Sequence, residues 1–267
     1  MIKVKDKDEL IKIIKSRPDN ANLNDLDVSN ITDMSSLFKN SKFNGDISKW
    51  DVSNVTNMYG MFDNSFFNND ISNWNVSNVK NMSFMFSQSQ FNQDISHWNV
   101  SNVTNMSGMF DFSNFNKDIS RWNVSKVTNM SYMFEDSSFN QDISKWNVSN
   151  VIYMNYMFSN SKFNKNISNW NVSNVIQMSE MFQNSSFDQD ISHWDVSNVK
   201  DMGAIFYNCK ISEKNLNKII LRWKINPNAN IAKFYNRIGS ANRLLKKQKQ
   251  LRKQKLGNFG KLIDIID

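Results

Sequence analysis

The chain carries one pattern of apolar and polar positions that recurs every 24 residues. Between Leu26 and Lys210, each unit holds a short alternating apolar segment, then apolar residues at helical spacing, then a polar stretch. Fifteen of the twenty phenylalanines fall in two fixed positions of the unit. Self-similarity at such a period is typical of a repeat array, in which each unit packs on its neighbours. Tryptophan holds one position in strict register: Trp50, Trp74, Trp98, Trp122, Trp146, Trp170 and Trp194.

The third unit illustrates the elements that this pattern predicts. Trp74 to Val76 alternates apolar and polar residues, as a strand with one buried face does. The next apolar residues have the spacing of one face of a short helix or 3₁₀ turn. They are Val79, Met82, Met85 and Phe86. Parallel strands lie about 4.8 Å apart whereas helices need about 8–10 Å. Because strands stack more closely than helices, an array of such units must curve toward its strands. We therefore predict an α/β repeat solenoid of eight units, curved gently, with the strands on the concave side.

The two ends of the chain depart from the repeat and predict caps. In residues 1–25, Asp6 and Glu9 have the spacing of a helix start, and an apolar stripe follows them. Residues 26–211 form the predicted solenoid. In residues 212–267 we expect a helix that covers the last unit, anchored by Trp223, and then a basic tail. Caps are required because the end units of an array would otherwise expose apolar faces.

The repeated residues resemble a known family. Ile-x-x-Trp-x-Val looks like the Leu-x-x-Leu-x-Leu core of leucine-rich repeats, and WDVSNVTNM…MF…FNxDIS is similar to the BspA-like leucine-rich repeat surface proteins. The likeness covers residues 26–210 and recurs eight times. It implies a leucine-rich-repeat-like solenoid used for adhesion or protein binding, with no catalytic residues. The basic C-terminal segment lies outside it, and the secretion or lipid-anchor signals common in that family are not recognisable in this chain.

Charge is divided unevenly along the chain. The net charge is +7, yet residues 212–267 hold fourteen Lys and Arg against three Asp and Glu.

The N-terminus is charged where a signal peptide needs an apolar run, and no stretch is long enough to span a bilayer. The single cysteine, Cys209, stands in a small-residue position and is expected to be buried and inert. We predict a protein of the cytoplasm or of a larger particle, and of the cell surface only if a leader was removed.

One outward-facing position of the unit varies, and it is the best candidate for recognition. It comes directly before each tryptophan, and nothing structural fixes its identity. A solvated face that drifts freely is the alternative explanation. The predicted partner-binding residues, on the expected concave side, are Lys49, Asn73, His97, Arg121, Lys145, Asn169 and His193.

Catalytic, metal and cofactor chemistry finds little support in the sequence. Both histidines lie in the variable position but four units apart, roughly 19 Å at the spacing of parallel strands. An aspartate recurs from Asp46 to Asp190, with Asn166 in one unit, and a Ca²⁺ ladder would need more oxygen ligands and more glycine. Capping of loop amides is therefore the expected role of these aspartates. We predict no catalytic residue, no metal site and no cofactor.

The basic tail suggests an anionic partner. Its cations are Lys246, Lys247, Lys249, Arg252, Lys253 and Lys255. A solvated tail that aids solubility is the simpler explanation, and base stacking is poorly supported because few aromatic residues interleave. The sequence thus favours a non-enzymatic scaffold that binds a protein or a glycan. The alternatives are a structural component of a phage or viral particle, docked through the tail onto an acidic or nucleic-acid surface, and a nucleic-acid-binding protein.

Overall fold

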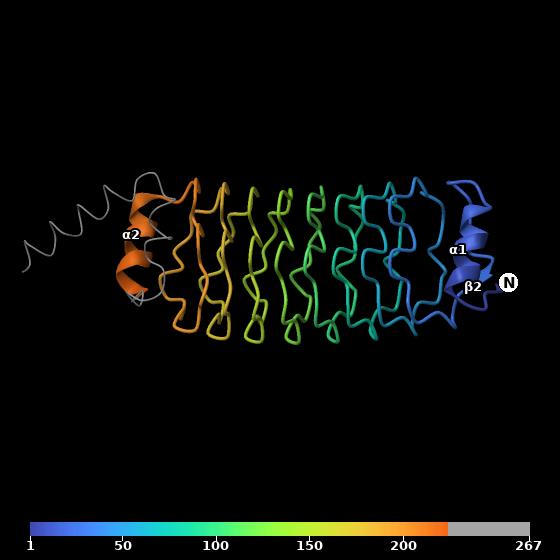
Figure 1. Cartoon of the computed structure of the whole chain (residues 1–267), viewed down its shortest axis with the longest axis horizontal. Helices are drawn as coiled ribbons and strands as arrows, with labels where there is room; N and C mark the ends of the chain where they lie inside the picture. The colour runs from blue at the N-terminus through green and yellow to red at the C-terminus, as the bar shows by residue number, and fades with distance from the viewer. Residues whose placement is uncertain (224–267) are drawn as a thin grey trace, which may run out of the picture.

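The computed structural model describes residues 1–223, which form a long stack of coils closed by a helix at each end (Figure 1). The regular elements within this part are β1 (Ile2–Lys3), α1 (Lys7–Lys15), β2 (Leu26–Asp27) and α2 (Glu213–Arg222). The strands β1 and β2 pair in parallel, with Ile2 opposite Leu26. Between β2 and α2 the chain runs through turns, and successive coils lie side by side.

The coils are joined by backbone hydrogen bonds between residues one repeat apart. Single parallel bridges link each coil to the next in one column, from Asp33–Asn57 to Gln177–Asp201. The residues that follow continue the contact: the Gly60 N–H donates to the Ser83 carbonyl at 2.9 Å. Backbone groups that a helix would pair internally are thus paired with the neighbouring coil.

This arrangement corrects two predicted elements. The segment Trp74 to Val76 is not a strand, and the segment from Val79 to Phe86 is a series of turns rather than the predicted short helix or 3₁₀ turn. The backbone takes a positive φ at two positions of this unit, 55° at Phe84 and 51° at Gln88. The left-handed conformation interrupts both a helix and an extended strand.

The core contains the repeated aromatic and methionine positions together with the repeated isoleucine and valine positions. All eight tryptophans are at most 4% exposed. The Trp122 indole N–H donates to the Ile95 carbonyl of the preceding coil at 3.1 Å, and this bond recurs along the stack. Phe110 stacks on Phe134 of the next coil with ring centroids 5.8 Å apart. These residues belong to one continuous core, and the indole bonds satisfy the polar atoms that it contains.

Both predicted cap helices are present. The Asp6 side chain accepts a hydrogen bond from the Glu9 N–H at 2.9 Å, and α1 begins at the next residue, Lys7. At the other end α2 reproduces the contacts of a further coil. Trp223 stacks on Trp194 with centroids 6.5 Å apart, and its indole N–H donates to the Ile191 carbonyl at 3.2 Å. Trp223 is therefore the anchor that the sequence predicted.

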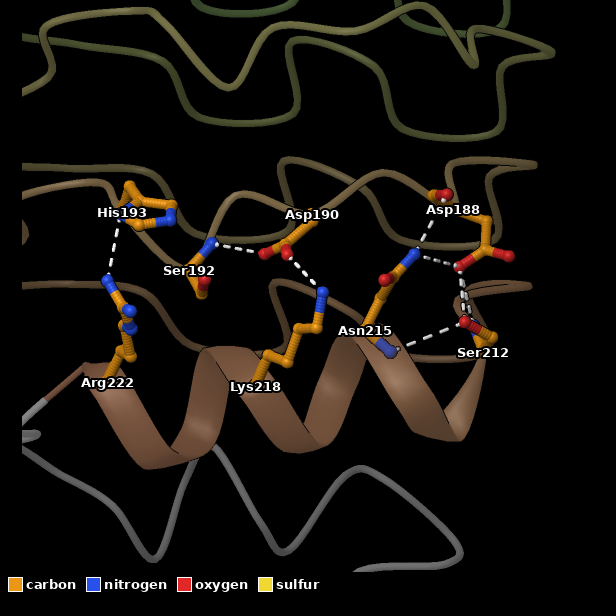
Figure 2. Close-up of polar contacts among 8 residues, drawn as sticks. All are labelled: Asp188, Asp190, Ser192, His193, Ser212, Asn215, Lys218 and Arg222. Carbon is orange, nitrogen blue, oxygen red and sulfur yellow. Dashed lines mark hydrogen bonds and ion pairs between the residues drawn. The ribbon is translucent and has the colours of Figure 1, made fainter.

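Polar contacts hold α2 against the last coil (Figure 2). The Ser212 N–H donates to Asp188 Oδ1 at 2.8 Å, as the Asp188 N–H donates to Asn164 one coil earlier at 2.8 Å. The Lys218 ammonium donates to Asp190 at 2.7 Å, and this bond holds the pKa of the Asp190 carboxyl well below its usual range. The helix thus satisfies polar groups that the last coil would otherwise expose.

Candidate functional site

The predicted partner-binding column lies on the surface along the whole stack. Each member occupies the exposed corner of a tight turn between a buried isoleucine and a buried tryptophan. In the third unit the Trp74 N–H donates to the Ile71 carbonyl at 3.1 Å, which leaves Asn73 at the corner. All seven predicted residues are exposed: Lys49, Asn73, His97, Arg121, Lys145, Asn169 and His193. The column is therefore placed where a partner could reach it.

The centre of this column is hollowed. A shallow depression of about 500 Å³ is lined by residues of both charges, and they come from two neighbouring coils. Its lining residues are Asp94, Ser96, His97, Lys117, Asp118 and Arg121. Mixed charges on a shallow surface suit contact with a polar partner rather than burial of an apolar ligand.

At its end the column meets the C-terminal cap. The Arg222 guanidinium of α2 lies 2.9 Å from His193 Nδ1 and donates to it (Figure 2). His193 is exposed but already engaged, so the freely accessible part of the column ends at Asn169. No group of three or more His, Cys, Asp or Glu side chains that could hold a metal ion occurs within residues 1–223.

The repeated aspartates cap loop amides, as predicted. Asp94 Oδ1 accepts the Ser96 N–H at 2.9 Å, and this backbone bond lowers the pKa of the Asp94 carboxyl. Asn166 accepts the Ser168 N–H in the same way at 2.9 Å, which explains why asparagine is tolerated there. Asparagine columns also bond along the stack, since the Asn78 amide donates to the Ser53 carbonyl at 2.7 Å. These polar columns are structural.

The single cysteine is only partly buried, so the prediction for it needs adjustment. The Cys209 thiol lies 3.3 Å from the Phe187 carbonyl and 3.5 Å from the Ser185 hydroxyl. Burial raises the pKa of the Cys209 thiol. A thiol in this state is a poor nucleophile, which agrees with an inert role.

A second group of side chains was missed by the sequence analysis. We call it the acidic–aromatic cluster, and it comprises Asp111, Tyr132, Glu135, Asp136, Tyr156 and Glu180. Tyr132 and Tyr156 of adjacent coils stack with centroids 5.0 Å apart. The Tyr156 hydroxyl donates to Glu180 at 2.7 Å. Tyr132 remains 37% exposed, so the cluster reaches the surface.

The carboxyl groups of this cluster are held in an unusual state. Burial, together with the Asp136 carboxylate, raises the pKa of Asp111 to about 7. Burial and the neighbouring Asp111 carboxylate raise the pKa of Glu135 to about 7. Burial also raises the pKa of the Tyr132 hydroxyl, and the charge of Glu135 adds to this effect. Perturbed groups gathered in one place mark a candidate functional site.

The sequence did contain a signal for this cluster. The positions that hold Tyr132 and Glu135 vary between units as freely as the position before the tryptophan. On the predicted short helix these positions would lie away from the apolar face, where such variation is expected. In the structure they lie in turns, and the residues that share the Tyr132 position in other units are Ser36, Gly60, Phe84, Gly108, Tyr156, Glu180 and Ala204.

The predicted anionic-partner residues, Lys246, Lys247, Lys249, Arg252, Lys253 and Lys255, lie outside the described residues. Among residues 1–223 no helix has the length and apolar character that a membrane crossing requires. A search of curated proteins and a search of solved structures gave no match.

Comparison with protein families gives four overlapping matches to one family model, whose description is "Mycoplasma protein of unknown function, DUF285". The matched segments are residues 9–113, 67–162, 88–183 and 138–248. The overlaps reflect the repeat, since one model can be placed in several positions along the array. Together the matches begin within α1, span the stack of coils and include α2. The chain is therefore a repeat protein and belongs to this Mycoplasma family, DUF285.

Proposed function

We propose that the chain is a non-enzymatic interaction scaffold that binds a protein or a glycan through the column before the tryptophans. A single observation carries this proposal. Positions that keep the same residue from unit to unit face inward or bond to neighbouring coils, whereas this column is exposed and its residues differ between units. Arg121 and His97 border the depression at its centre. An extended row of differing polar side chains on a regular stack suits recognition of an extended partner.

We also propose that the coils are a variant of the leucine-rich-repeat arrangement of the BspA-like proteins. Ile71, Trp74 and Val76 stand where that repeat has its leucines, and all three are buried. The residue pattern of the repeat also supports a relation to the BspA-like proteins. An adhesion or recognition role follows from this resemblance.

Replacing three cations of the column tests the scaffold. We expect the Lys49→Ala, Arg121→Ala, Lys145→Ala variant to bind partners about tenfold more weakly, because exposed charge contacts contribute on the order of 0.5 kcal/mol each. Two measurements compare the full chain with the variant. Quantitative mass spectrometry measures the proteins captured by each immobilised chain, and a glycan array measures the glycans to which each chain binds.

A matched control removes the same charge elsewhere. Lys42, Lys162 and Lys165 are exposed and lie outside the column, so their replacement by alanine should leave capture unchanged. Equal losses in the two variants would reject the column as the binding surface. Deletion of residues 240–267 distinguishes the scaffold from the alternative role in a larger assembly. Partner capture persists if the chain is a scaffold, whereas loss of all partner capture indicates that the chain docks onto a larger assembly through its tail.

A further inference from the structure

One position of the repeat carries charged residues in four of the first five coils. In chain order it holds Lys39, Asp63, Ser87, Asp111 and Glu135. In the first two coils the charges are opposite, and the Lys39 ammonium lies 2.8 Å from the Asp63 carboxylate. The pair shows that this position accommodates a lysine ammonium against a carboxylate of the next coil.

In the fourth and fifth coils the same column lacks the cation. Asp111 and Glu135 are both acidic and follow each other directly in this column. None of the ion pairs within residues 1–223 involves Asp111, Glu135 or Asp136. Adjacent like charges are unfavourable unless a counter-charge joins them or one of the carboxyl groups keeps a proton.

Asp111 gives independent evidence of a missing ligand. Its side chain is only 8% exposed, and its Oδ1 atom has no hydrogen-bond partner. A buried carboxylate oxygen without a donor is costly, and natural structures seldom retain one without a reason. An approaching ammonium or guanidinium group would supply the missing donor.

Exposed aromatic residues of the same two coils favour an organic cation. Phe112 follows Asp111 in the chain and is 54% exposed, and Tyr132 is 37% exposed. Aromatic faces attract ammonium and guanidinium groups, and they also pack against the methylene stem of lysine or arginine. A neutral glycan could stack on the same rings, but it would leave the charge of Asp111 and Glu135 uncompensated.

We propose that Asp111 and Glu135, flanked by Phe112 and Tyr132, form a binding site for a lysine or arginine side chain in a basic segment of a protein partner. The site reproduces between two molecules the contact that Lys39 and Asp63 make within one. It uses a different column from the scaffold surface, so it does not depend on that proposal.

The test measures binding of fluorescently labelled octalysine to the full chain by fluorescence anisotropy at low and moderate salt. We expect the Asp111→Asn, Glu135→Gln variant to lose at least about tenfold in affinity, because truncating one side of a buried charge contact is expensive. The control is Asp51→Asn, Asp70→Asn, which removes the same charge at exposed positions where other coils carry asparagine. It should change affinity less than twofold, which is within the range of exposed charges.

A second variant supplies the cation from within the chain. Ser87→Lys places a lysine one coil before Asp111, as Lys39 precedes Asp63. We expect this variant to lose octalysine binding, whereas Gln90→Lys, at an exposed position of the same coil, should retain it. Circular dichroism establishes that each variant is folded.

Three results would overturn the proposal. The first is absence of octalysine binding to the unaltered chain. The second is equal weakening of octalysine binding in the Asp111→Asn, Glu135→Gln variant and in the Asp51→Asn, Asp70→Asn control. The third is retention of octalysine binding by folded Ser87→Lys. Chitohexaose serves as a neutral glycan probe in parallel. If chitohexaose binds, octalysine does not, and Tyr132→Ala abolishes chitohexaose binding, the cluster is a glycan platform instead.

Discussion

Replacing Trp122 with alanine should lower the free energy of unfolding by about 3–5 kcal/mol, as loss of a large core aromatic side chain does. The indole is 3% exposed and stacks against Phe110 with ring centroids 6.3 Å apart. Its N–H also donates to the Ile95 carbonyl at 3.1 Å, so the substitution removes one of the two hydrogen bonds that this carbonyl accepts, the other coming from the Trp98 N–H. Guanidinium unfolding followed by circular dichroism measures the change.

The matched control is Phe66→Ala. Phe66 is 59% exposed, so its removal should change the free energy of unfolding by less than about 0.5 kcal/mol. A cost below about 1 kcal/mol for Trp122→Ala would place the tryptophan column outside the core.

Asp111→Asn should stabilise the protein at pH 8 relative to the unaltered chain, with a difference that shrinks toward pH 5. The pKa of Asp111 is raised to about 7 by burial and by the Asp136 carboxylate. Between its usual value and about 7 the folded state keeps a proton that the unfolded state has lost. Stability therefore falls as the pH rises through this window and levels off above it. We expect a gain of about 4 kcal/mol at pH 8, because each pKa unit corresponds to about 1.4 kcal/mol.

Thermal melts of both proteins at pH 5, 6, 7 and 8 measure this difference. Glu135 shares the effect because burial and the Asp111 carboxylate raise its pKa to about 7, so Glu135→Gln should act in the same direction. The exposed control Asp51→Asn should keep a constant offset from the unaltered chain. An Asp111→Asn variant that is less stable than the unaltered chain at pH 8 would show that a cation of the chain already neutralises the carboxylate.

The repeat and its core could be predicted because they depend on spacing alone. Apolar residues 24 positions apart must coincide when identical units stack, whatever path the backbone takes between them. The caps were predictable for a similar reason, since Asp6 has short-range helix-start chemistry. Trp223 was identified because a large apolar residue after the last unit has one apolar surface to cover.

The backbone path within the unit could not be predicted in this way. The spacing of Val79, Met82 and Met85 fits two structures equally well. One is a helix with these residues on one face, and the other is a series of turns in which every third side chain points into the core. The decisive feature is the left-handed backbone at positions such as Phe84, with a φ of 55°. Phenylalanine and tyrosine carry no preference for that conformation, so it arises from pairing between coils and is invisible in one unit.

The same limit applies to the functional surfaces. The column before the tryptophans was found because it varies beside residues that do not. The acidic–aromatic cluster was missed because the positions of Asp111 and Tyr132 vary away from the apolar face of a segment that the spacing predicts to be helical. Its meaning depends on burial and on the neighbour in the next coil, and neither quantity can be read from a single 24-residue unit.

Iodide quenching of tryptophan fluorescence tests most directly whether the coils stack around a closed aromatic core. All eight tryptophans are at most 4% exposed, so the quenching constant of the native protein should be a small fraction of that in guanidinium. A native quenching constant close to that of the unfolded chain would show that the indoles lie in solvent and would contradict the stacked core.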